Sequence, residues 1–327
     1  MKPLPALYAR MLRYRVAAMV WMFMLLGAAH PDGIPAFSPA LGWATLALAS
    51  SYVAATSVND IADVDVDRVN HPGDAGRPLV NGAARERDLW RLHAGAAVLA
   101  LLAAVPLGVG GVLVVACSLA IGIAYSLPPA RLSYRTDLAP LVLAVAYVFV
   151  PFGLGAFAAG RALQGGDATL AAALFALFLA RITLKDFRDR EGDALYGKPT
   201  LLLRHGKDAT CAVSLTALLA GDALMLLALR PPAAFALLLQ VFVGGAAWML
   251  YRLWQADDLR REQVAIGAGA RMGNGLLVCV LAWLVLGGEG ADDAIRFGFA
   301  ATLAALFAGS FGLLAARPDE VVIGYKG

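Results

Sequence analysis

Long apolar stretches recur along almost the whole chain and limit what it can fold into. About 20 helical residues cross the hydrocarbon core of a bilayer, so apolar stretches of about 18 or more residues predict membrane-spanning helices. Backbone groups in lipid must be hydrogen-bonded within their own segment, and long runs without alternation favour helices over a β-barrel. The sequence therefore predicts an all-α, polytopic transmembrane bundle. Its ten candidate segments lie near residues 13–29, 38–58, 89–106, 108–126, 138–159, 168–185, 209–229, 233–253, 267–287 and 294–315.

The composition agrees with a membrane protein. Hydrophobic residues make up 60% of the 327 residues, and charged residues only 16%. No Gly/Ser-rich or Pro-rich linker divides the chain, so we expect residues 1–327 to form a single domain surrounded by membrane lipids. The net charge of +3 mostly reflects membrane orientation, and we expect no nucleic-acid partner. Cys117, Cys211 and Cys279 are scattered inside predicted helices without metal spacing.

The distribution of Lys and Arg predicts the orientation. With the N-terminus in the cytoplasm and sides alternating at each helix, 24 of the 27 basic residues lie on the cytoplasmic side. Only Arg161, Arg230 and Arg296 lie opposite, which fits the positive-inside rule. Arg13 and Arg15 are interpreted as topology anchors. The first segment also has the features of a signal peptide, but the charge asymmetry fits a retained helix. We expect the bacterial inner membrane if the source is bacterial.

The first acidic motif is NDIADVDVD, at residues 59–67, directly after an apolar segment. Asn59, Asp63 and Asp67 are spaced by four, so on a helix they share one face, with Asp60 about a turn behind Asp63. Asp65 points elsewhere and is expected to face water and to tolerate substitution. The motif therefore predicts a row of carboxylates at the cytoplasmic end of a helix.

A second acidic motif, KDFRDREGD, occupies residues 185–193. Its aspartates Asp186, Asp189 and Asp193 follow the spacing i, i+3, i+7 and again share one helical face. Concentrated negative charge at a bilayer edge is costly unless a cation neutralises it. Oxygen ligands without a His or Cys cluster select a hard ion, and Mg²⁺ typically joins a few carboxylates to a substrate phosphate. The two rows together predict a magnesium-bridged diphosphate site.

Basic and aromatic side chains that could contact a diphosphate flank both motifs. A guanidinium can hold phosphate oxygens in a bidentate fork. Any one of these basic residues could instead be a positive-inside anchor, and interface tyrosines are common. The candidate diphosphate-binding residues are Asn59, Arg77, Tyr125, Arg131, Tyr147, Lys185 and Lys198. No role is predicted for His71.

Four motifs in this order resemble the UbiA-type superfamily of intramembrane aromatic prenyltransferases. NDIADVDVD matches that family's N-D-x-x-D-x-x-x-D, and residues 186–193 match its D-x-x-D-x-x-x-D. YSLPPARL at 125–132 is similar to its Y-S-x-P-P-x-R-L connector, and RPLVNG at 77–82 to its R-P-[IL]-x-x-G loop. Each motif alone is weak, but four in the right order are specific. The resemblance spans residues 8–290 or so.

The resemblance implies a ring of about nine transmembrane helices around a central cavity, capped by cytoplasmic loops. With the ten apolar segments counted above, we expect a bundle of nine to ten helices. It implies an enzyme that transfers an isoprenyl group from a prenyl diphosphate to an acceptor small molecule or lipid. Asp63, Asp67, Asp189 and Asp193 would act in catalysis. The Mg²⁺ ligands that it implies are Asn59, Asp60, Asp63, Asp67, Asp186, Asp189 and Asp193.

The chain departs from the family pattern in places. Val80 and Asn81 replace a Pro and a Ser of the loop that the family commonly carries. The segment at 294–315 exceeds the family's nine helices and is expected to be an added helix unless an earlier segment is re-entrant. The continuation of the second motif, GDALYGKPTL, is similar to the branch that contains homogentisate, chlorophyll and glycerol-phosphate prenyltransferases.

Two alternatives stay open at this point. A terpene cyclase of the same family would ionise the same diphosphate and capture the cation internally. A membrane transporter would be expected to carry acidic residues midway along its helices, where Asp222 is the exception in a chain nearly free of them.

Overall fold

The computed structural model of the protein describes residues 4–34 and 38–316. Lys2, Arg317 and Lys326, which contribute to the predicted charge asymmetry, lie outside the described residues. The described chain is helical throughout its regular elements, as predicted. Its helices are α1 (Leu4–Met11), α2 (Tyr14–Ala29), α3 (Pro39–Ala62), α4 (Val64–Asn70), α5 (Glu86–Ala104), η1 (Val105–Leu107), α6 (Gly108–Ser126), η2 (Leu132–Tyr134), α7 (Leu138–Ala144), η3 (Val145–Phe149), α8 (Val150–Ala158), α9 (Gly165–Ile182), η4 (Thr183–Phe187), α10 (Arg190–Leu195), α11 (Leu201–Leu229), α12 (Ala233–Trp254), α13 (Leu259–Gly288) and α14 (Asp293–Ala316).

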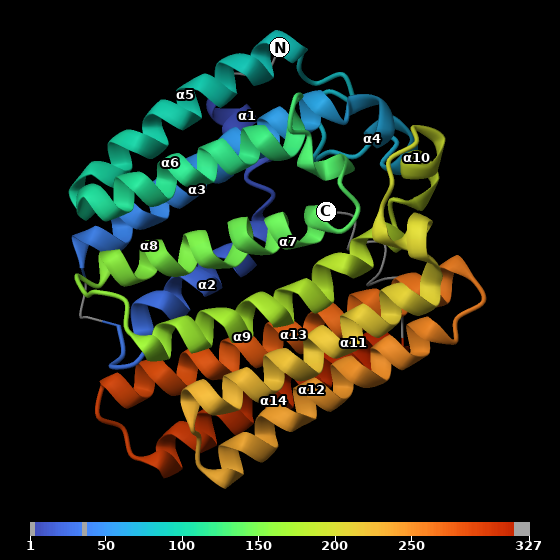
Figure 1. Ribbon diagram of the computed structural model, residues 1–327. Coiled ribbons are helices and arrows are strands. Elements are labelled where there is room, and N and C mark those ends of the chain that lie inside the picture. Colours follow the sequence, from blue (N-terminus) through green and yellow to red (C-terminus); the bar gives the residue numbers. More distant parts are fainter. Residues whose placement is uncertain (1–3, 35–37, 317–327) are drawn as a thin grey trace.

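All ten predicted apolar segments are helical. By length and composition, eight stretches of the described chain could cross a membrane, or nine if the bent pair α1 and α2 forms one span. One of the eight, Glu86–Ser126, contains 41 residues and is interrupted after η1 at Gly108, whose φ is 75°. There α5 turns back into α6, and Figure 1 shows the two lying side by side. Each of them has 19 residues, enough to span a hydrocarbon core.

Several long helices begin at a residue whose side chain caps the first turn. The Ser38 hydroxyl accepts a hydrogen bond from the Ala40 N–H, with Pro39 at the first helical position of α3. Thr200 caps α11 in the same way through the Leu203 N–H, and Asp258 caps α13 through the Arg261 N–H. Such caps satisfy N–H groups that have no partner within the helix. The sequence thereby sets where the spans start.

The helices pack in two groups that α2 and α8 join. In the first group, α3 packs against α5 and α6, and in the second α9 packs against α11 and α13 packs against α12 and α14. The α2 and α8 helices pack against each other between the two groups (Figure 1). The short helices α4 and α10, which contain the last residues of the two acidic motifs, contact each other at one end of the bundle. Both motifs therefore meet at the same end.

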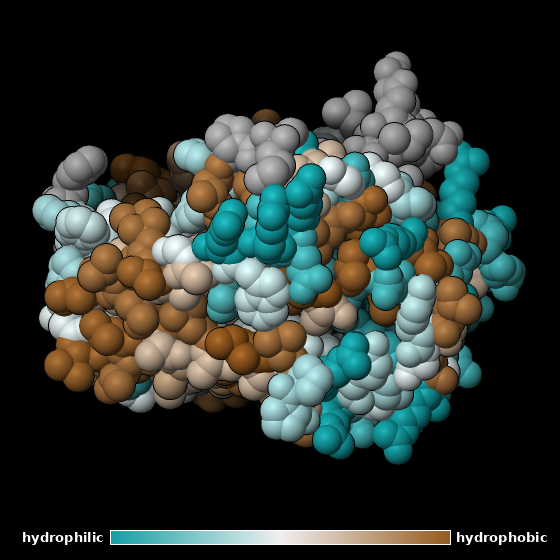
Figure 2. Space-filling model, turned by 90° about the horizontal axis from the view of Figure 1, so that it is seen from above, coloured by the Kyte–Doolittle hydropathy of each residue, from teal (hydrophilic) through white to brown (hydrophobic). Residues whose placement is uncertain are grey.

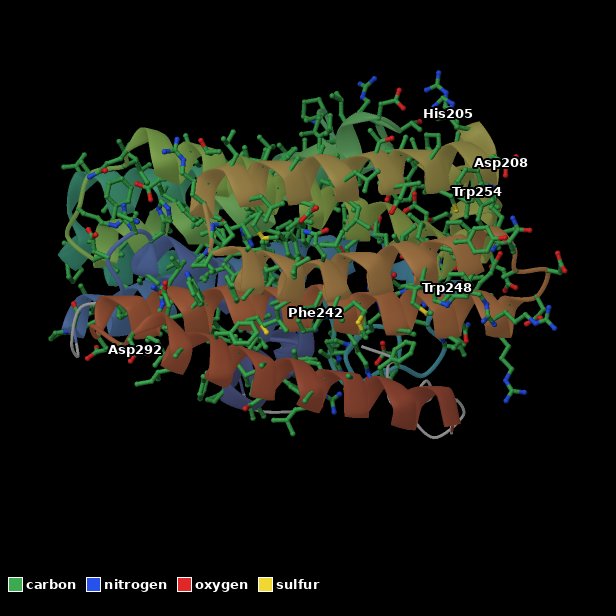
Figure 3. The ribbon with its side chains drawn as sticks, turned by 90° about the horizontal axis from the view of Figure 1, so that it is seen from below. His205, Asp208, Phe242, Trp248, Trp254 and Asp292 are labelled. Atoms are coloured by element: carbon green, nitrogen blue, oxygen red, sulfur yellow. The ribbon has the colours of Figure 1, made fainter. Side chains whose placement is uncertain are left out.

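The surface separates apolar sides from a polar end. Viewed from above in Figure 2, apolar side chains cover the left part, and hydrophilic ones gather toward the right, where α4 and α10 lie in Figure 1. Figure 3 shows His205, Asp208 and Trp254 at one end of the long helices and Asp292 at the other. Exposed Leu102 and Val109 illustrate the apolar flank of α5 and α6. This is the arrangement of an integral multi-pass membrane protein whose sides face lipid.

Two glycines bring α2 and α8 into backbone contact. A Cβ atom at Gly155 would lie 1.8 Å from the Met24 carbonyl oxygen, and one at Gly27 would lie 2.1 Å from the Phe152 carbonyl oxygen. Small residues at helix crossings let backbones approach closely in membrane proteins. The junction between the two helix groups therefore depends on the absence of side chains at these two positions.

Replacing Gly155 with alanine is expected to destabilise the protein by about 1–3 kcal/mol, because the added methyl group forces α2 away from α8. Gly153→Ala is the matched control, since its Cβ would meet only the Val114 Cγ2 atom at 3.9 Å. Thermal unfolding of the purified variants in detergent measures the difference. Equal melting temperatures for the two variants would contradict the proposed role of this crossing.

The span from α7 to α8 contains a π-helical turn, η3. Pro151 follows this turn and has no N–H to donate to the carbonyl of Tyr147 four residues earlier. The widened turn places Tyr147 against Tyr52, with ring centroids 6.1 Å apart, and stacks it on Phe178 at 5.2 Å. The proline thus shapes the wall of the bundle where a candidate site residue lies.

Candidate active site

A cavity of about 1810 Å³ extends from the polar end into the bundle. Its mouth is lined by the residues of the acidic motifs, including Asp63 and Asp193. Deeper walls are apolar and include Phe23, Phe178 and Phe242, the last of which lies midway along the bundle in Figure 3. The cavity therefore joins a charged mouth to an apolar interior.

The first acidic motif lies where α3 passes into α4. Asp63 ends α3, yet its N–H still donates to the Asn59 carbonyl, and the Asp67 N–H donates to the Asp63 carbonyl. The i, i+4 spacing survives the break, and the Asn59 amide donates to the Asp63 carboxylate at 3.2 Å. Asn59, Asp63 and Asp67 all line the cavity, as the shared face predicts. Asp65 instead is exposed, as predicted, and it pairs with exposed Arg68.

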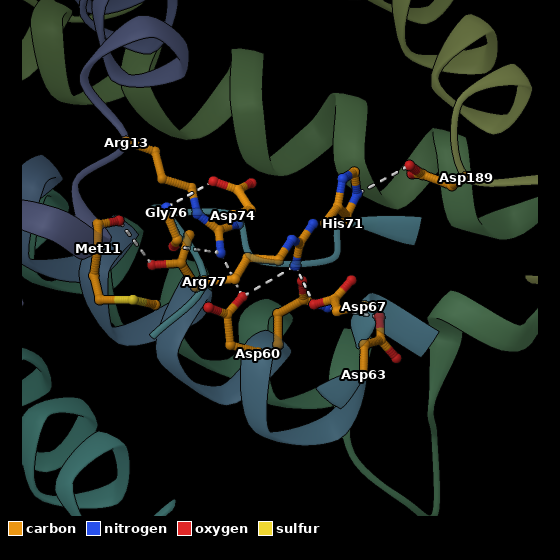
Figure 4. A network of polar contacts seen from close by, with 12 residues as sticks. Met11, Arg13, Asp60, Asp63, Asp67, His71, Asp74, Gly76, Arg77 and Asp189 are labelled. Carbon is orange, nitrogen blue, oxygen red and sulfur yellow. Dashed lines mark hydrogen bonds and ion pairs between the residues drawn. The ribbon is translucent and has the colours of Figure 1, made fainter. Parts of the chain in front are cut away.

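Arginines neutralise the inner side of this motif. Arg77 donates to Asp67 and lies 3.4 Å from the Asp60 Oδ1 atom. Arg13 donates to Asp60 from the opposite side (Figure 4). Arg77 is thus close to the motif, as expected, and Arg13, which the sequence predicted only as a topology anchor, contacts the motif as well. The prediction for Arg13 was incomplete because the bend between α1 and α2, which brings it back over the motif, leaves no periodic signal in the sequence.

The second motif is split between η4 and α10. Asp189 precedes α10 and Asp193 lies within it, and both line the cavity. Lys185 precedes them, and its ammonium group lies 3.4 Å from the Tyr125 hydroxyl, so these two predicted residues are brought together at the mouth. Tyr147 lines the cavity below them.

Two side chains connect the motifs directly. The Lys198 ammonium group lies 3.1 Å from an Asp63 oxygen and 3.8 Å from an Asp193 oxygen. The His71 Nε2 atom lies 3.2 Å from an Asp189 oxygen, and Figure 4 marks this contact with a dashed line. Lys198 was a candidate from the sequence, and His71 was not. A signal for His71 does exist, because it continues the four-residue spacing of Asn59, Asp63 and Asp67 by one more step.

Three predicted site residues do not reach the cavity wall in the described part of the chain. Asp60 and Asp186 are buried beside it, 2% and 6% exposed. The Arg131 guanidinium instead stacks on the ring of Tyr134 at 3.8 Å, and the Lys198 ammonium group lies 6.0 Å from the same ring. Arg131 thus contacts Tyr134 and is not among the residues that line the cavity. The sequence placed it by motif alone, which does not specify how a turn directs its side chains.

Burial and charge shift the pKa values of the acidic groups in opposite directions. Burial, together with the charges of Asp60 and Asp63, raises the pKa of Asp67 to about 7. Burial raises the pKa of Asp193 to about 6, although Lys198 opposes the shift. Burial alone would raise the pKa of Asp189 as well, but the hydrogen bond with His71 and the charge of Arg188 lower it below its usual range. The mouth thus holds more carboxylates than its basic partners fully stabilise.

The residue types and unmet hydrogen bonds at the mouth fit Mg²⁺. The Oδ2 atom of Asp60 and the Oδ1 atom of Asp63 are buried without a hydrogen-bond partner, which is uncommon for carboxylate oxygens. Among the described residues, no three His, Cys, Asp or Glu side chains converge into a complete metal site. Mg²⁺ usually binds through one or two carboxylates plus substrate phosphates. The mouth therefore fits an ion that is held jointly with a phosphate ligand.

The model of the UbiA prenyltransferase family matches residues 16–275. The chain belongs to this family. The homogentisate phytyltransferase of Synechocystis is 35% identical over 199 residues, which are 58% of this chain and 62% of that protein. The 33 kDa chain of bacteriochlorophyll synthase from Rhodobacter capsulatus is 29% identical over 226 residues, 66% of this chain and 72% of that one. The match to the first thus spans less than two thirds of its length.

Solved structures of UbiA homologues share the fold. A UbiA homologue from Archaeoglobus fulgidus, bound to DMAPP and Mg²⁺, superposes with a TM-score of 0.58 at 18% identity, covering 97% of this chain and 99% of that one. The recognition of the family from four motifs and the prediction of a helical membrane bundle are both confirmed. The single-domain prediction and the roles of individual residues stay predictions.

Proposed function

We propose that this protein is an Mg²⁺-dependent prenyltransferase that moves an isoprenyl group from a prenyl diphosphate to an acceptor. The observation that carries the proposal is the joining of two carboxylate rows at the mouth of one apolar cavity. Family membership and the DMAPP and Mg²⁺ bound by the Archaeoglobus homologue support it. A soluble diphosphate head and a long apolar tail match the two chemical halves of this cavity.

The diphosphate would lie among the basic groups at the mouth. Lys185, Lys198 and Arg77 line the cavity and would bind the diphosphate oxygens. Asn59, Asp63, Asp67, Asp189 and Asp193 line the mouth and would hold Mg²⁺, with Asp60 and Asp186 buried beside them. The bound metal would stabilise negative charge that builds on the departing diphosphate.

The reaction then needs bond cleavage followed by capture of the cation. The bond between the allylic carbon and the diphosphate oxygen breaks, and its electron pair leaves with the diphosphate. The acceptor donates an electron pair to the allylic cation and afterwards loses a proton. The aromatic walls, which include Tyr147 and Phe178, exclude water that would otherwise quench the cation.

Aromatic acceptors are the first to test. The name of the Synechocystis relative specifies homogentisate, and the second motif resembles the same branch of the family. We further infer that the mouth opens to the cytoplasm, because 24 of the 27 basic residues lie on the side that it occupies by the predicted topology.

Product analysis by mass spectrometry tests the proposal. Purified protein with Mg²⁺, prenyl diphosphates and aromatic or phosphate-bearing acceptors is expected to form a prenylated acceptor and inorganic diphosphate. Omission of Mg²⁺ is expected to abolish both products. A terpenoid formed without any acceptor would overturn the proposal in favour of a cyclase. Flux of solute into vesicles without any diphosphate release would overturn it in favour of a transporter.

A further inference from the structure

A second polar cluster lies in the cavity, apart from the acidic motifs. The Arg181 guanidinium on α9 donates to the Asn274 side-chain oxygen on α13 at 2.7 Å, and both residues line the cavity. The surrounding walls are apolar and include Leu177, Met272 and Leu277. An ionisable residue inside a membrane bundle that faces a cavity is costly and generally marks a binding or transport site. The proposed diphosphate chemistry does not use this pair.

The position of Arg181 relates the pair to the reacting carbon. Arg181 lies in the last turn of α9, and Lys185 follows four residues later in η4, so Arg181 is about one helical turn further from the polar end, and both residues line the cavity. Lys185 is at the mouth, where the diphosphate would bind. A molecule held by Arg181 would therefore lie next to the allylic carbon once the diphosphate is in place. That is where an acceptor has to be.

The wall beside this pair leaves room for a ligand. Gly273 precedes Asn274 and lines the cavity, and a Cβ atom placed there would have no neighbour within 4 Å. Gly269, one turn earlier, also lines the cavity, where a Cβ would make only an ordinary contact with Met249 at 3.6 Å. Small residues on α13 thus leave open space next to a fixed guanidinium.

From these observations we infer that Arg181 and Asn274 form the subsite that binds the head group of the acceptor, and that this head group carries a carboxylate or a phosphate. A planar guanidinium matches the oxygens of either group bidentately, and its bond to Asn274 fixes its orientation. Asn274 acts as a positioning residue, while Arg181 contacts the acceptor. The inference rests on the proposed prenyl transfer and specifies which acceptors it takes.

Steady-state kinetics of the wild-type protein and the Arg181→Gln variant test the inference. Two pairs of acceptors are compared, each with an anionic and an uncharged member: homogentisate with its amide, and a glycerol lipid phosphate with the corresponding alcohol. The wild-type protein is expected to prefer the anionic member of one pair, which identifies carboxylate or phosphate as the group. The variant is expected to raise the KM for that acceptor roughly 10- to 100-fold, the effect of losing hydrogen bonds from a charged group. The KM for the prenyl diphosphate is expected to change less than about twofold.

Controls separate this role from others. Arg252→Gln removes an exposed arginine at the end of α12 and is expected to leave both KM values unchanged. Arg181→Lys keeps the positive charge but loses the planar guanidinium that binds two oxygens at once, and it is expected to give an intermediate KM for the acceptor. Gly273→Leu fills the open space and is expected to weaken acceptor use without altering the Kd of the prenyl diphosphate, which keeps the inference testable if Arg181 variants fail to fold.

Three results would overturn the inference: no preference for the anionic acceptor in the wild type, equal losses for charged and uncharged acceptors in Arg181→Gln, or an increase confined to the KM of the prenyl diphosphate. The last would place Arg181 in the diphosphate site. A wild-type protein that releases no diphosphate with any acceptor would instead contradict the proposed prenyl transfer itself, so the two failures are distinguishable.

Discussion

Replacement of Asp63 with alanine is expected to lower the rate of prenyl transfer about 100- to 1,000-fold. Losses of this size are typical when an enzyme loses one group that stabilises charge in the transition state. Asp63 lies at the centre of the mouth, where it accepts hydrogen bonds from Asn59 and Lys198 and keeps one buried oxygen without a partner. Asp189→Ala is expected to behave similarly, because Asp189 holds the corresponding place in the second motif beside His71. Mg²⁺-dependent release of diphosphate by the purified variants measures both effects.

Asp65→Asn is the matched control for these variants. Asp65 belongs to the same nine-residue motif, but its side chain is 57% exposed and pairs with Arg68 at the surface. Exposed ion pairs contribute little to stability, so this variant is expected to retain transfer within about twofold of the wild type. Full Mg²⁺-dependent activity in both Asp63→Ala and Asp189→Ala would show that the carboxylate rows do not hold the diphosphate.

The contrast between Asp63 and Asp65 shows what the sequence was able to predict. The spacing of four residues fixes which side chains share a helical face, and this holds even though α3 ends at Asp63, because the backbone hydrogen bonds continue across the break. The ten apolar helical segments were predictable for the same reason, since local hydropathy and length determine them. Local periodicity was therefore sufficient wherever the structure is locally determined.

Contacts between distant segments were not predictable in this way. Arg13 donates a hydrogen bond to Asp60, which is 47 residues away in the sequence, and Arg181 donates one to Asn274, which is 93 residues away. Such pairs depend on how α2, α9 and α13 are arranged around the cavity, and no periodic pattern records that arrangement. Arg131 shows the converse, because its motif was recognised while its side chain turned toward Tyr134 rather than the cavity. Motifs specify which residues matter to a family but not where each side chain points.

Substitution of Lys198 is expected to have the second large effect on prenyl transfer, because this residue links the two motifs. Its ammonium group lies 3.1 Å from an Asp63 oxygen and 3.8 Å from an Asp193 oxygen, and its side chain is only 10% exposed. Burial alone would lower its pKa, but the charges of these aspartates raise it, so the group stays protonated. Without diphosphate, Lys198 thus takes the place of a cation between two proposed metal ligands.

Lys198→Met keeps the length of the side chain and removes its charge. Transfer is expected to fall about 100-fold, because the diphosphate loses a positive partner at the moment it departs. Binding of Mg²⁺ alone is expected to become roughly tenfold tighter, because the ammonium group no longer competes with the metal for Asp63 and Asp193. The size follows from the coupling energies of close charge pairs. Calorimetric titration with Mg²⁺ in the absence of diphosphate measures this second effect.

The opposite signs of the two effects make this variant informative. A residue that only stabilised the fold would weaken metal binding and transfer together when removed. Lys207→Met is the matched control, since Lys207 donates to Glu262 away from the cavity and its loss is expected to change neither Mg²⁺ affinity nor the KM of the diphosphate. Weaker Mg²⁺ binding in Lys198→Met would show that the lysine supports the carboxylates rather than competing for them. In that case the ammonium group organises the mouth before the diphosphate arrives, and the metal adds to it instead of replacing it.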